Sequence, residues 1–305
     1  MNGFFNILKP TGMSSAAVVA VIRRLTGEKR VGHAGTLDPE AAGVLPIMTG
    51  KAARLFDYLT DKEKEYVAVC AFGSRTDTQD ATGEVTETGD NYPDRENVIR
   101  AAAELTGDIR QVPSMYSAIK VGGKPLYARA RKGETVEVPE RTVHIESIEV
   151  LRDMPEHGIE IRVRCGKGTY IRTLCEDLGN KCGCPAHMRS LLRTRSGVFT
   201  IDEAITLDEA RTLAETGTLT ERMLPPDWPL SHLLRTDMPA RMSKRVINGA
   251  KIPLTALNSP DIGEDQVTRV YLNDQFWGLA VRQGDELVWK AQIAPEETEE
   301  SKACE

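Results

Sequence analysis

The chain has 305 residues, of which 40% are hydrophobic and 28% charged, and its 39 lysine and arginine residues against 45 aspartate and glutamate residues give a net charge of −6. No stretch approaches the roughly 18 consecutive apolar residues of a membrane helix, and the N-terminal segment has no secretion-signal pattern, so we expect no membrane insertion or export. The six cysteines are too sparse for a disulfide scaffold and lack zinc-knuckle spacing, which favours a cytoplasmic protein. The length of the chain predicts about two domains.

The N-terminal region begins with a helix signal followed by a loop signal. Ser14 is a good helix cap and Gly27 a good helix stop, so the apolar stretch between them predicts a helix. Residues 32–46 are too rich in glycine and proline for a regular helix or strand, and Pro39 holds Asp38 in an extended conformation. The loop either presents the Asp38 carboxylate for catalysis or forms a turn in which Asp38 caps a helix beginning at Pro39.

The middle of the chain mixes helix and strand patterns. We expect β-strands at residues 66–72, 143–151 and 159–165, and the alternation of apolar and charged residues in the last of these predicts one face in contact with water. A helix is expected from Ile171 to Lys181, ending at Gly183. This mixture predicts an α+β fold with a mixed or mostly antiparallel sheet.

Prolines around residues 225–240 interrupt both periodicities and indicate a domain boundary near residue 230. We therefore expect one domain over residues 1–230 and a small β domain over residues 235–292. Residues 293–305 form a glutamate-rich tail that we expect to be disordered. The expected strands of the small domain lie at 268–272, 276–282 and 286–293.

The negative net charge conceals two basic segments. Residues 114–133 carry five lysines and arginines and no acidic residue, and residues 159–195 carry eight basic against three acidic residues. A polyanion responds to the local field, because charges beyond about 10 Å are largely screened at ~0.1 M salt. The segments indicate either a nucleic-acid-binding face or ordinary solvated helix faces.

Five motifs between residues 9 and 195 resemble, in order, those of the TruB family of pseudouridine synthases. They are KPTGMSS at 9–15, GTLDPEAAGVLP at 35–46, KEY at 64–66, RTDTQDATG at 75–83 and GTYIR at 168–172. Two positions depart from the family pattern: Ser14 stands where threonine is usual, and Ser114 replaces the second proline of a usual pair. Neither position carries the chemistry that the resemblance implies.

The resemblance implies the residues that perform the reaction. Asp38 would be the indispensable carboxylate, either attacking C1′ of the ribose or assisting a glycal route. Arg172 would be the cation that keeps Asp38 ionised, and on an expected strand it would share a face with Tyr170. Tyr66 would stack under the target base or take a proton from the sugar, although an ordinary core tyrosine is the alternative.

The resemblance also implies how the base and the RNA are held. His33 would help to hold the flipped base and Leu191 would line its pocket; a surface-loop histidine and a core leucine are the alternatives. Residues 114–133 resemble the family's RNA-clamping insertion, for which a solvated helix face is the competing interpretation. We expect contacts with RNA phosphates from Lys9, Lys120, Lys124, Arg129, Arg131 and Lys132.

The implied function is that of a stand-alone cytoplasmic isomerase that converts uridine 55 in the TΨC loop of tRNA to pseudouridine. The reaction involves no redox change, so we expect no metal or organic cofactor, and we expect a monomer without an obligatory protein partner. The target uridine must be flipped out of its stack. The C-terminal segment resembles, more loosely, a PUA-type RNA-binding barrel.

Three alternatives remain open. One is a guide-RNA-dependent enzyme of the same family, and another is an RNA-binding or RNA-folding protein whose isomerase site is incidental. The third, a carboxylate-dependent hydrolase, would require a second acid beside Asp38, where the motifs place a cation instead.

Overall fold

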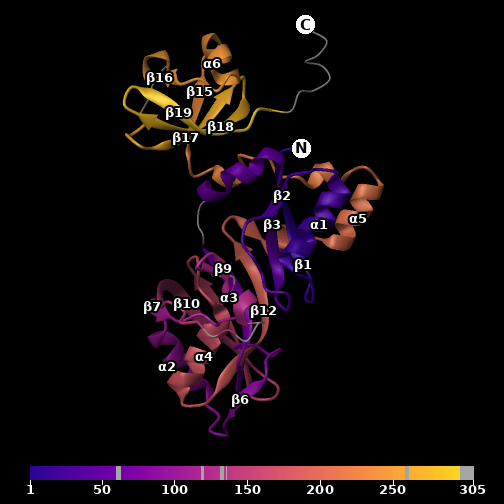
Figure 1. The fold of residues 1–305 in the computed structure, drawn as a ribbon, viewed down its shortest axis with the longest axis vertical. Coiled ribbons are helices and arrows are strands. Elements are labelled where there is room, and N and C mark those ends of the chain that lie inside the picture. Colours follow the sequence, from indigo (N-terminus) through magenta and orange to yellow (C-terminus); the bar gives the residue numbers. More distant parts are fainter. Residues whose placement is uncertain (60–62, 118–119, 131–133, 135, 258–260, 296–305) are drawn as a thin grey trace.

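A computed structural model describes residues 1–59, 63–117, 120–130, 134, 136–257 and 261–295 (Figure 1). Its main feature is a ten-stranded mixed sheet in the order β14-β1-β3-β12-β4-β11-β10-β7, with β2 beside β3 and β13 beside β12. The α+β prediction is therefore confirmed. The strands are β1 (Gly3–Lys9), β2 (Val31–His33), β3 (Ala42–Thr49), β4 (Lys64–Phe72), β7 (Gly107–Gln111), β10 (Arg141–Met154), β11 (Gly158–Cys165), β12 (Ala186–Ser196), β13 (Phe199–Thr200) and β14 (Ile205–Thr206).

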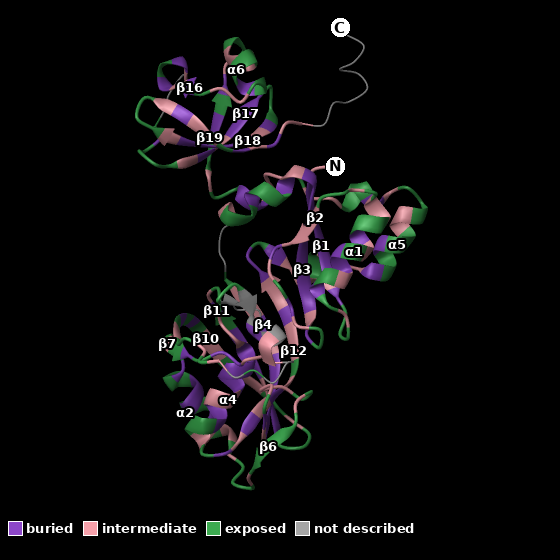
Figure 2. Cartoon of the chain, in the orientation of Figure 1, coloured by how far each residue is buried: buried purple, intermediate pink, exposed green. Residues whose placement is uncertain are grey.

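Helices cover the two halves of this sheet separately, as Figure 1 shows. Helices α1 (Ser15–Thr26) and α5 (Leu207–Glu215) lie beside each other at the β1 end, where apolar side chains of α1, α5, β1 and β3 form one core cluster. Helices α2 (Arg95–Glu104) and α4 (Ile171–Cys182) cover the β4, β11 and β10 half, with a second core cluster beneath them. Buried residues accordingly concentrate between helices and sheet in both halves (Figure 2).

The capping signals in the sequence place the helix ends correctly. The Ser14 hydroxyl accepts a hydrogen bond from the backbone N–H of Ala17, and Gly27 adopts the left-handed conformation that ends α1. Helix α4 ends in the same way at Gly183, which has a φ angle of 69°. Both predicted helices are therefore confirmed.

The two halves of the sheet meet at β12. This strand pairs antiparallel with β4 along most of its length, but it pairs in parallel with β3 only at Leu192 and Arg193. Gly43 is required at this junction, because its φ is +118° and a Cβ there would lie 2.2 Å from the carbonyl oxygen of Arg193. Beyond this short contact, the loops of the two halves can enclose a pocket.

A second, five-stranded sheet follows in the C-terminal part, in the order β15-β17-β18-β19-β16. It has its own apolar core, and a further cluster that includes Tyr271 and Phe276 joins it to Phe199 and Trp228 of the preceding part. We propose that residues 235–292 form a domain of their own. The elements are β15 (Leu234–Met238), α6 (Ser243–Ile247), β16 (Ile252–Pro253), β17 (Val267–Leu272), β18 (Gln275–Gln283) and β19 (Glu286–Gln292).

Two small hairpins lie outside these sheets. One is formed by β5 (Ser74–Thr76) and β6 (Val85–Thr88), and the other by β8 (Lys120–Val121) and β9 (Lys124–Pro125), which is followed by the five-residue helix α3 (Leu126–Ala130). Residues 296–305 of the expected tail lie outside the described part. Within the described part, no helix is both long and apolar enough to cross a membrane.

Candidate active site

A pocket of about 320 Å³ lies where the two halves of the main sheet diverge. Its walls come from the loop that precedes β3, from β4, from the turn before α4 and from β12. The pocket brings together five of the residues that the sequence analysis selected, although they are up to 153 positions apart in the chain. These are Asp38, Tyr66, Tyr170, Arg172 and Leu191.

The Asp38 loop is an irregular turn held by hydrogen bonds from α1. The Ser15 hydroxyl bonds both the N–H and the carbonyl of Leu37, at 2.9 Å each. No helix begins at Pro39; the backbone N–H of Ala41 returns to the carbonyl of Asp38 in a single turn. The helix-capping alternative for Asp38 is therefore wrong, and its carboxylate is free to face the pocket.

The side chain of Lys9 also holds the Asp38 loop in place. Its ammonium group is fully buried and donates to the carbonyl oxygens of Pro10 at 2.8 Å, Met13 at 2.6 Å and Pro39 at 3.0 Å. Burial lowers the Lys9 pKa to about 8, while the nearby Glu40 and Asp38 carboxylates act in the opposite direction. A buried ammonium with three carbonyl partners cannot reach a phosphate, so the expected RNA contact of Lys9 is corrected to a structural role.

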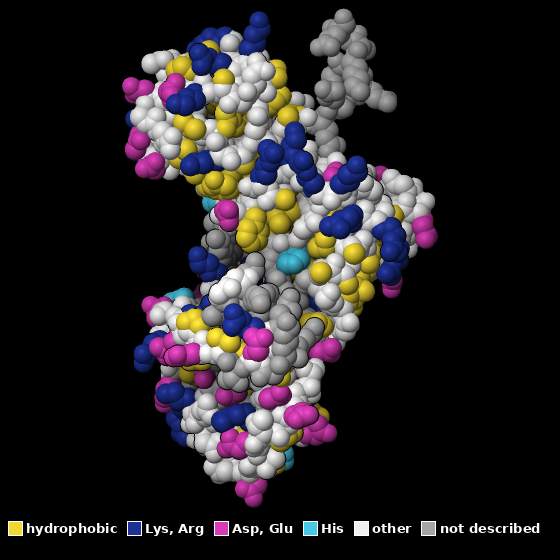
Figure 3. Space-filling model, viewed as in Figure 1, with side chains coloured by type: hydrophobic (Ala, Val, Ile, Leu, Met, Phe, Trp, Pro, Cys, Tyr) yellow, Lys and Arg dark blue, Asp and Glu magenta, His cyan; other side chains and the backbone are white. Residues whose placement is uncertain are grey.

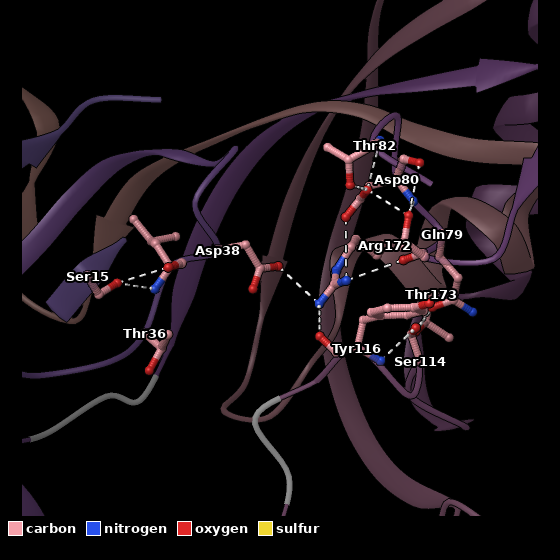
Figure 4. A network of polar contacts seen from close by, with 12 residues as sticks. Ser15, Thr36, Asp38, Gln79, Asp80, Thr82, Ser114, Tyr116, Arg172 and Thr173 are labelled. Carbon is pink, nitrogen blue, oxygen red and sulfur yellow. Dashed lines mark hydrogen bonds and ion pairs between the residues drawn. The ribbon is translucent and has the colours of Figure 1, made fainter. Parts of the chain in front are cut away.

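Arg172 and Asp38 form an ion pair at the centre of the pocket. Nη2 of Arg172 lies 3.1 Å from Oδ2 of Asp38, and the arginine side chain is 6% exposed whereas the aspartate is 41% exposed (Figure 4). The guanidinium also lies 3.4 Å from Asp80 and donates to the carbonyls of Thr78 and Tyr116, each at 3.3 Å. Arg172 is thus held from behind while Asp38 remains accessible.

Asp80 is a site residue that the sequence analysis quoted in a motif without giving it a role. Its Oδ1 accepts hydrogen bonds from the hydroxyls of Thr78 and Thr82 and from the Thr82 N–H, which leaves Oδ2 to face Arg172. The signal was present in the RTDTQDATG run, but its partner lies 92 positions away.

Tyr170 and Arg172 lie at the start of helix α4, so the expectation that they share a strand is wrong. Tyr170 is the N-cap residue of α4 and Arg172 belongs to its first turn. The physical reason is that the buried Gln111 side chain accepts from the Tyr170 N–H at 3.0 Å and donates to its carbonyl at 3.2 Å, which satisfies the backbone where the helix begins. Burial raises the pKa of the Tyr170 hydroxyl.

Tyr66 and Leu191 line the pocket from the neighbouring strands β4 and β12. Tyr66, on β4, is 8% exposed, and its burial raises the pKa of its hydroxyl. Leu191, on β12, is half-buried. His33 does not line the pocket, but the neighbouring Ala34 does. Burial and the Arg193 charge lower the His33 pKa, and its Nδ1 is buried without a hydrogen-bond partner in the described part.

The basic insertion is described only in part. Lys120 and Lys124 lie on the strands of the β8–β9 hairpin, and Arg129 lies half-buried on α3. Arg131 and Lys132 lie outside the described residues. Their contacts with RNA therefore stay predictions. Among the described residues, no group of three or more histidine, cysteine or acidic side chains is placed to hold a metal ion.

Comparison with known proteins gives consistent matches. Residues 23–171 match the model of the TruB family pseudouridylate synthase N-terminal domain, and residues 172–231 match that of the tRNA pseudouridylate synthase B C-terminal domain. The tRNA pseudouridine synthase B of Bacillus licheniformis is 44% identical over 87% of this chain and 88% of its own length. That of Alkaliphilus oremlandii is 41% identical over 92% and 93%.

Solved structures resemble this chain over nearly its whole length. A chain of a Cbf5-Nop10-Gar1 complex superposes with a TM-score of 0.72 at 26% identity, covering 96% of this chain and 85% of its own. A chain of an H/ACA RNP bound to a substrate RNA containing 2′-deoxyuridine has the same TM-score at 25% identity, with coverages of 97% and 86%.

Proposed function

Because the chain belongs to the TruB family of pseudouridine synthases, we propose that it converts uridine 55 in the TΨC loop of tRNA to pseudouridine. The chain is an isomerase of this family, and its curated relatives carry the name tRNA pseudouridine synthase B. The observation that carries the proposal is the accessible Asp38 carboxylate, paired with the buried Arg172 in a pocket lined by Tyr66 and Tyr170.

The reaction breaks the N1–C1′ bond, turns the uracil and forms a C5–C1′ bond. The proton leaves C5 and N1 gains one, so no atom is added or lost. Asp38 either attacks C1′ or assists loss of the sugar proton, and in both routes it must remain ionised. Arg172 supports that state, because a carboxylate in a partly desolvated pocket is stable only beside a cation.

The freed uracil must stay in the pocket while it turns. We propose that Tyr66 stacks against it and that Tyr170 and Leu191 line the rest of the cavity, whose volume of about 320 Å³ exceeds that of one base. We further propose that His33 contacts the flipped nucleotide. Its neighbour Ala34 lines the pocket, which places His33 beside the cavity.

The RNA must approach the open side of this pocket. On the face shown in Figure 3, acidic side chains are frequent at the lower end, near α2 and β6, whereas basic side chains are more frequent in the upper half. We propose that the basic insertion at 114–133 and the C-terminal PUA-like domain contact RNA phosphates around the pocket. We also propose that the enzyme is monomeric and cytoplasmic. We further propose that it acts without a guide RNA, which is supported by its 44% identity to a tRNA pseudouridine synthase B against 26% to the Cbf5 chain.

The test is tritium release from a tRNA transcript labelled with [5-³H]uridine, because loss of the C5 hydrogen reports the isomerisation itself. The wild-type protein should release tritium from the normal transcript and not from one in which uridine 55 is replaced by cytidine. Asp38→Asn should release none while it binds the transcript normally. Tritium release from the transcript that lacks uridine 55 would contradict the assignment of uridine 55 as the target nucleotide. Binding without any release from either transcript would favour an RNA-binding protein.

A further inference from the structure

Arg193 is a buried cation in the pocket wall to which the family motifs assign no role in the reaction. It lies on β12, is 1% exposed and forms no ion pair with any carboxylate of the described residues. Its guanidinium instead donates to three backbone carbonyls: Nε to Val44 at 2.8 Å, Nη1 to Thr36 at 3.3 Å and Nη2 to Gly35 at 3.1 Å. An arginine buried without an anionic partner is costly, so a specific role is expected at this position.

Two of these carbonyls belong to the catalytic loop. Gly35 and Thr36 precede Asp38 by three and two residues, so the guanidinium fixes the backbone from which the carboxylate projects. Val44 lies on the strand that follows the loop. Arg193 therefore holds the loop at both its entrance and its exit.

The same guanidinium also faces Tyr66. Arg193 and Tyr66 are directly opposite each other in the antiparallel pairing of β12 and β4, and paired residues project to the same face of a sheet. The neighbouring Arg193 guanidinium acts to lower the Tyr66 pKa, against the larger effect of burial. A guanidinium N–H that donates to a phenol oxygen occupies one of its lone pairs and leaves the phenol O–H to donate elsewhere.

We propose that Arg193 is a positioning residue for the isomerisation, which fixes the Tyr66 hydroxyl and the Asp38 loop relative to each other and directs the Tyr66 O–H toward the bound nucleotide. The inference rests on the proposed function, because it assigns the nucleotide as the partner of Tyr66. A planar guanidinium suits this position, because its five N–H groups can serve three carbonyls and a phenol in fixed directions. A lysine ammonium has three donors and cannot satisfy all four.

A purely structural role would also make Arg193 important, so the test must detect coupling to Tyr66. We would measure the single-turnover rate of tritium release and the RNA affinity for Arg193→Lys, Arg193→Gln, Tyr66→Phe and the Arg193→Gln/Tyr66→Phe double variant. Arg193→Gln retains an N–H donor without a buried charge. It therefore provides a second test if the buried ammonium of Arg193→Lys prevents folding. The matched control is Arg195→Gln, on the same strand but partly exposed and 3.7 Å from Glu63.

The expected result is a rate lowered roughly tenfold to hundredfold in both Arg193 variants, with RNA affinity within about threefold of wild type. In the Tyr66→Phe background, the fold-loss of the single-turnover rate caused by Arg193→Gln should be at least about threefold smaller than in wild type, since the hydroxyl that Arg193 orients is absent. Arg195→Gln should react at the wild-type rate.

Multiplicative effects of the two substitutions would overturn the proposal, as would full activity of Arg193→Lys or failure of both Arg193 variants to fold. Failure of the proposed function itself is distinguishable, because the wild-type protein would then release no tritium.

Discussion

Replacing Asp80 by asparagine tests whether the carboxylate behind Arg172 contributes to turnover. Asp80 has a 13% exposed side chain and lies 3.4 Å from Nη1 of Arg172, on the side away from Asp38. Asparagine preserves the size of the side chain and an oxygen that can accept the threonine hydrogen bonds. The substitution therefore removes little but the charge. Asp38 would then be the single carboxylate paired with Arg172 among the described residues.

The magnitude follows from the separation of the charges. At 3.4 Å and an effective dielectric constant of about 20, the Coulomb attraction between Asp80 and Arg172 is about 5 kcal/mol. Relief of the desolvation of the Asp80 carboxylate offsets part of this, and hydrogen bonds to charged groups typically contribute about 1.5–3 kcal/mol net. A loss of about 2 kcal/mol in the transition state lowers the rate roughly tenfold to hundredfold.

The assay is single-turnover tritium release, with RNA affinity measured separately. We expect Asp80→Asn to lower the rate and to leave RNA affinity within about threefold of wild type, because Arg172 contacts protein groups rather than solvent. Glu84→Gln removes one negative charge from the exposed side of the same hairpin and should leave the rate unchanged. A rate for Asp80→Asn within threefold of wild type would refute the reasoning, as would an equal loss of affinity.

Three further predictions concern the framework of the pocket. In urea denaturation, Gly43→Ala should destabilise the protein by about 3 kcal/mol more than Gly217→Ala, because both have positive φ but the new Cβ collides with the backbone of Arg193 only at position 43. Lys9 has a folded-state pKa of about 8, below that of the unfolded chain, so the unfolded chain binds more protons between pH 8 and about 10.5. The unfolding free energy of wild type relative to Lys9→Met should therefore rise with pH across this window by up to about 3 kcal/mol; a flat difference would contradict the assignment. Gln111→Leu leaves the Tyr170 N–H without its partner and removes one of the two donors to the Tyr170 carbonyl, which keeps the Leu174 N–H; it should lower both the melting temperature and, about tenfold, the turnover number. Turnover equal to wild type would argue against a role of Gln111 in placing Arg172.

Local signals were sufficient where the cause of a structure lies close by in the chain. The cap at Ser14 and the left-handed glycine at Gly27 bracket α1 as the sequence indicates, because both act within a few residues. The irregular turn around Asp38 was likewise predicted from its glycines and prolines, but the expectation of no regular strand over residues 32–46 was wrong at its C-terminal end. Residues 42–46 belong to β3, because their backbone pairs with β1, which lies more than 30 positions earlier in the chain. The alternative to the turn, a helix at Pro39, was not excluded by sequence, since the contact that holds the loop comes from Ser15.

The errors occurred where the cause lies far away in sequence. Tyr170 was assigned to a strand, but Gln111, 59 positions earlier, binds its backbone where α4 starts. Lys9 was expected to contact an RNA phosphate as part of the RNA-binding set that the family resemblance implied. In the fold, the carbonyl of Pro39 lies beside it and, with two others, satisfies its ammonium group. Neither partner could be identified without the tertiary structure.

The arrangement of charges explains why the site is built at the seam of the sheet. Asp38 projects from the half that contains β1 and β3, whereas Arg172 and Tyr66 belong to the half that contains β4 and α4. Two buried arginines lie at this boundary, Arg172 at the start of α4 and Arg193 on β12, and they are satisfied differently. Arg172 pairs with carboxylates, while Arg193 donates to three neutral backbone carbonyls. Arg172 therefore pairs with the Asp38 carboxylate and Arg193 holds the loop from which it projects, so that a substitution at either should slow the chemistry while RNA binding persists.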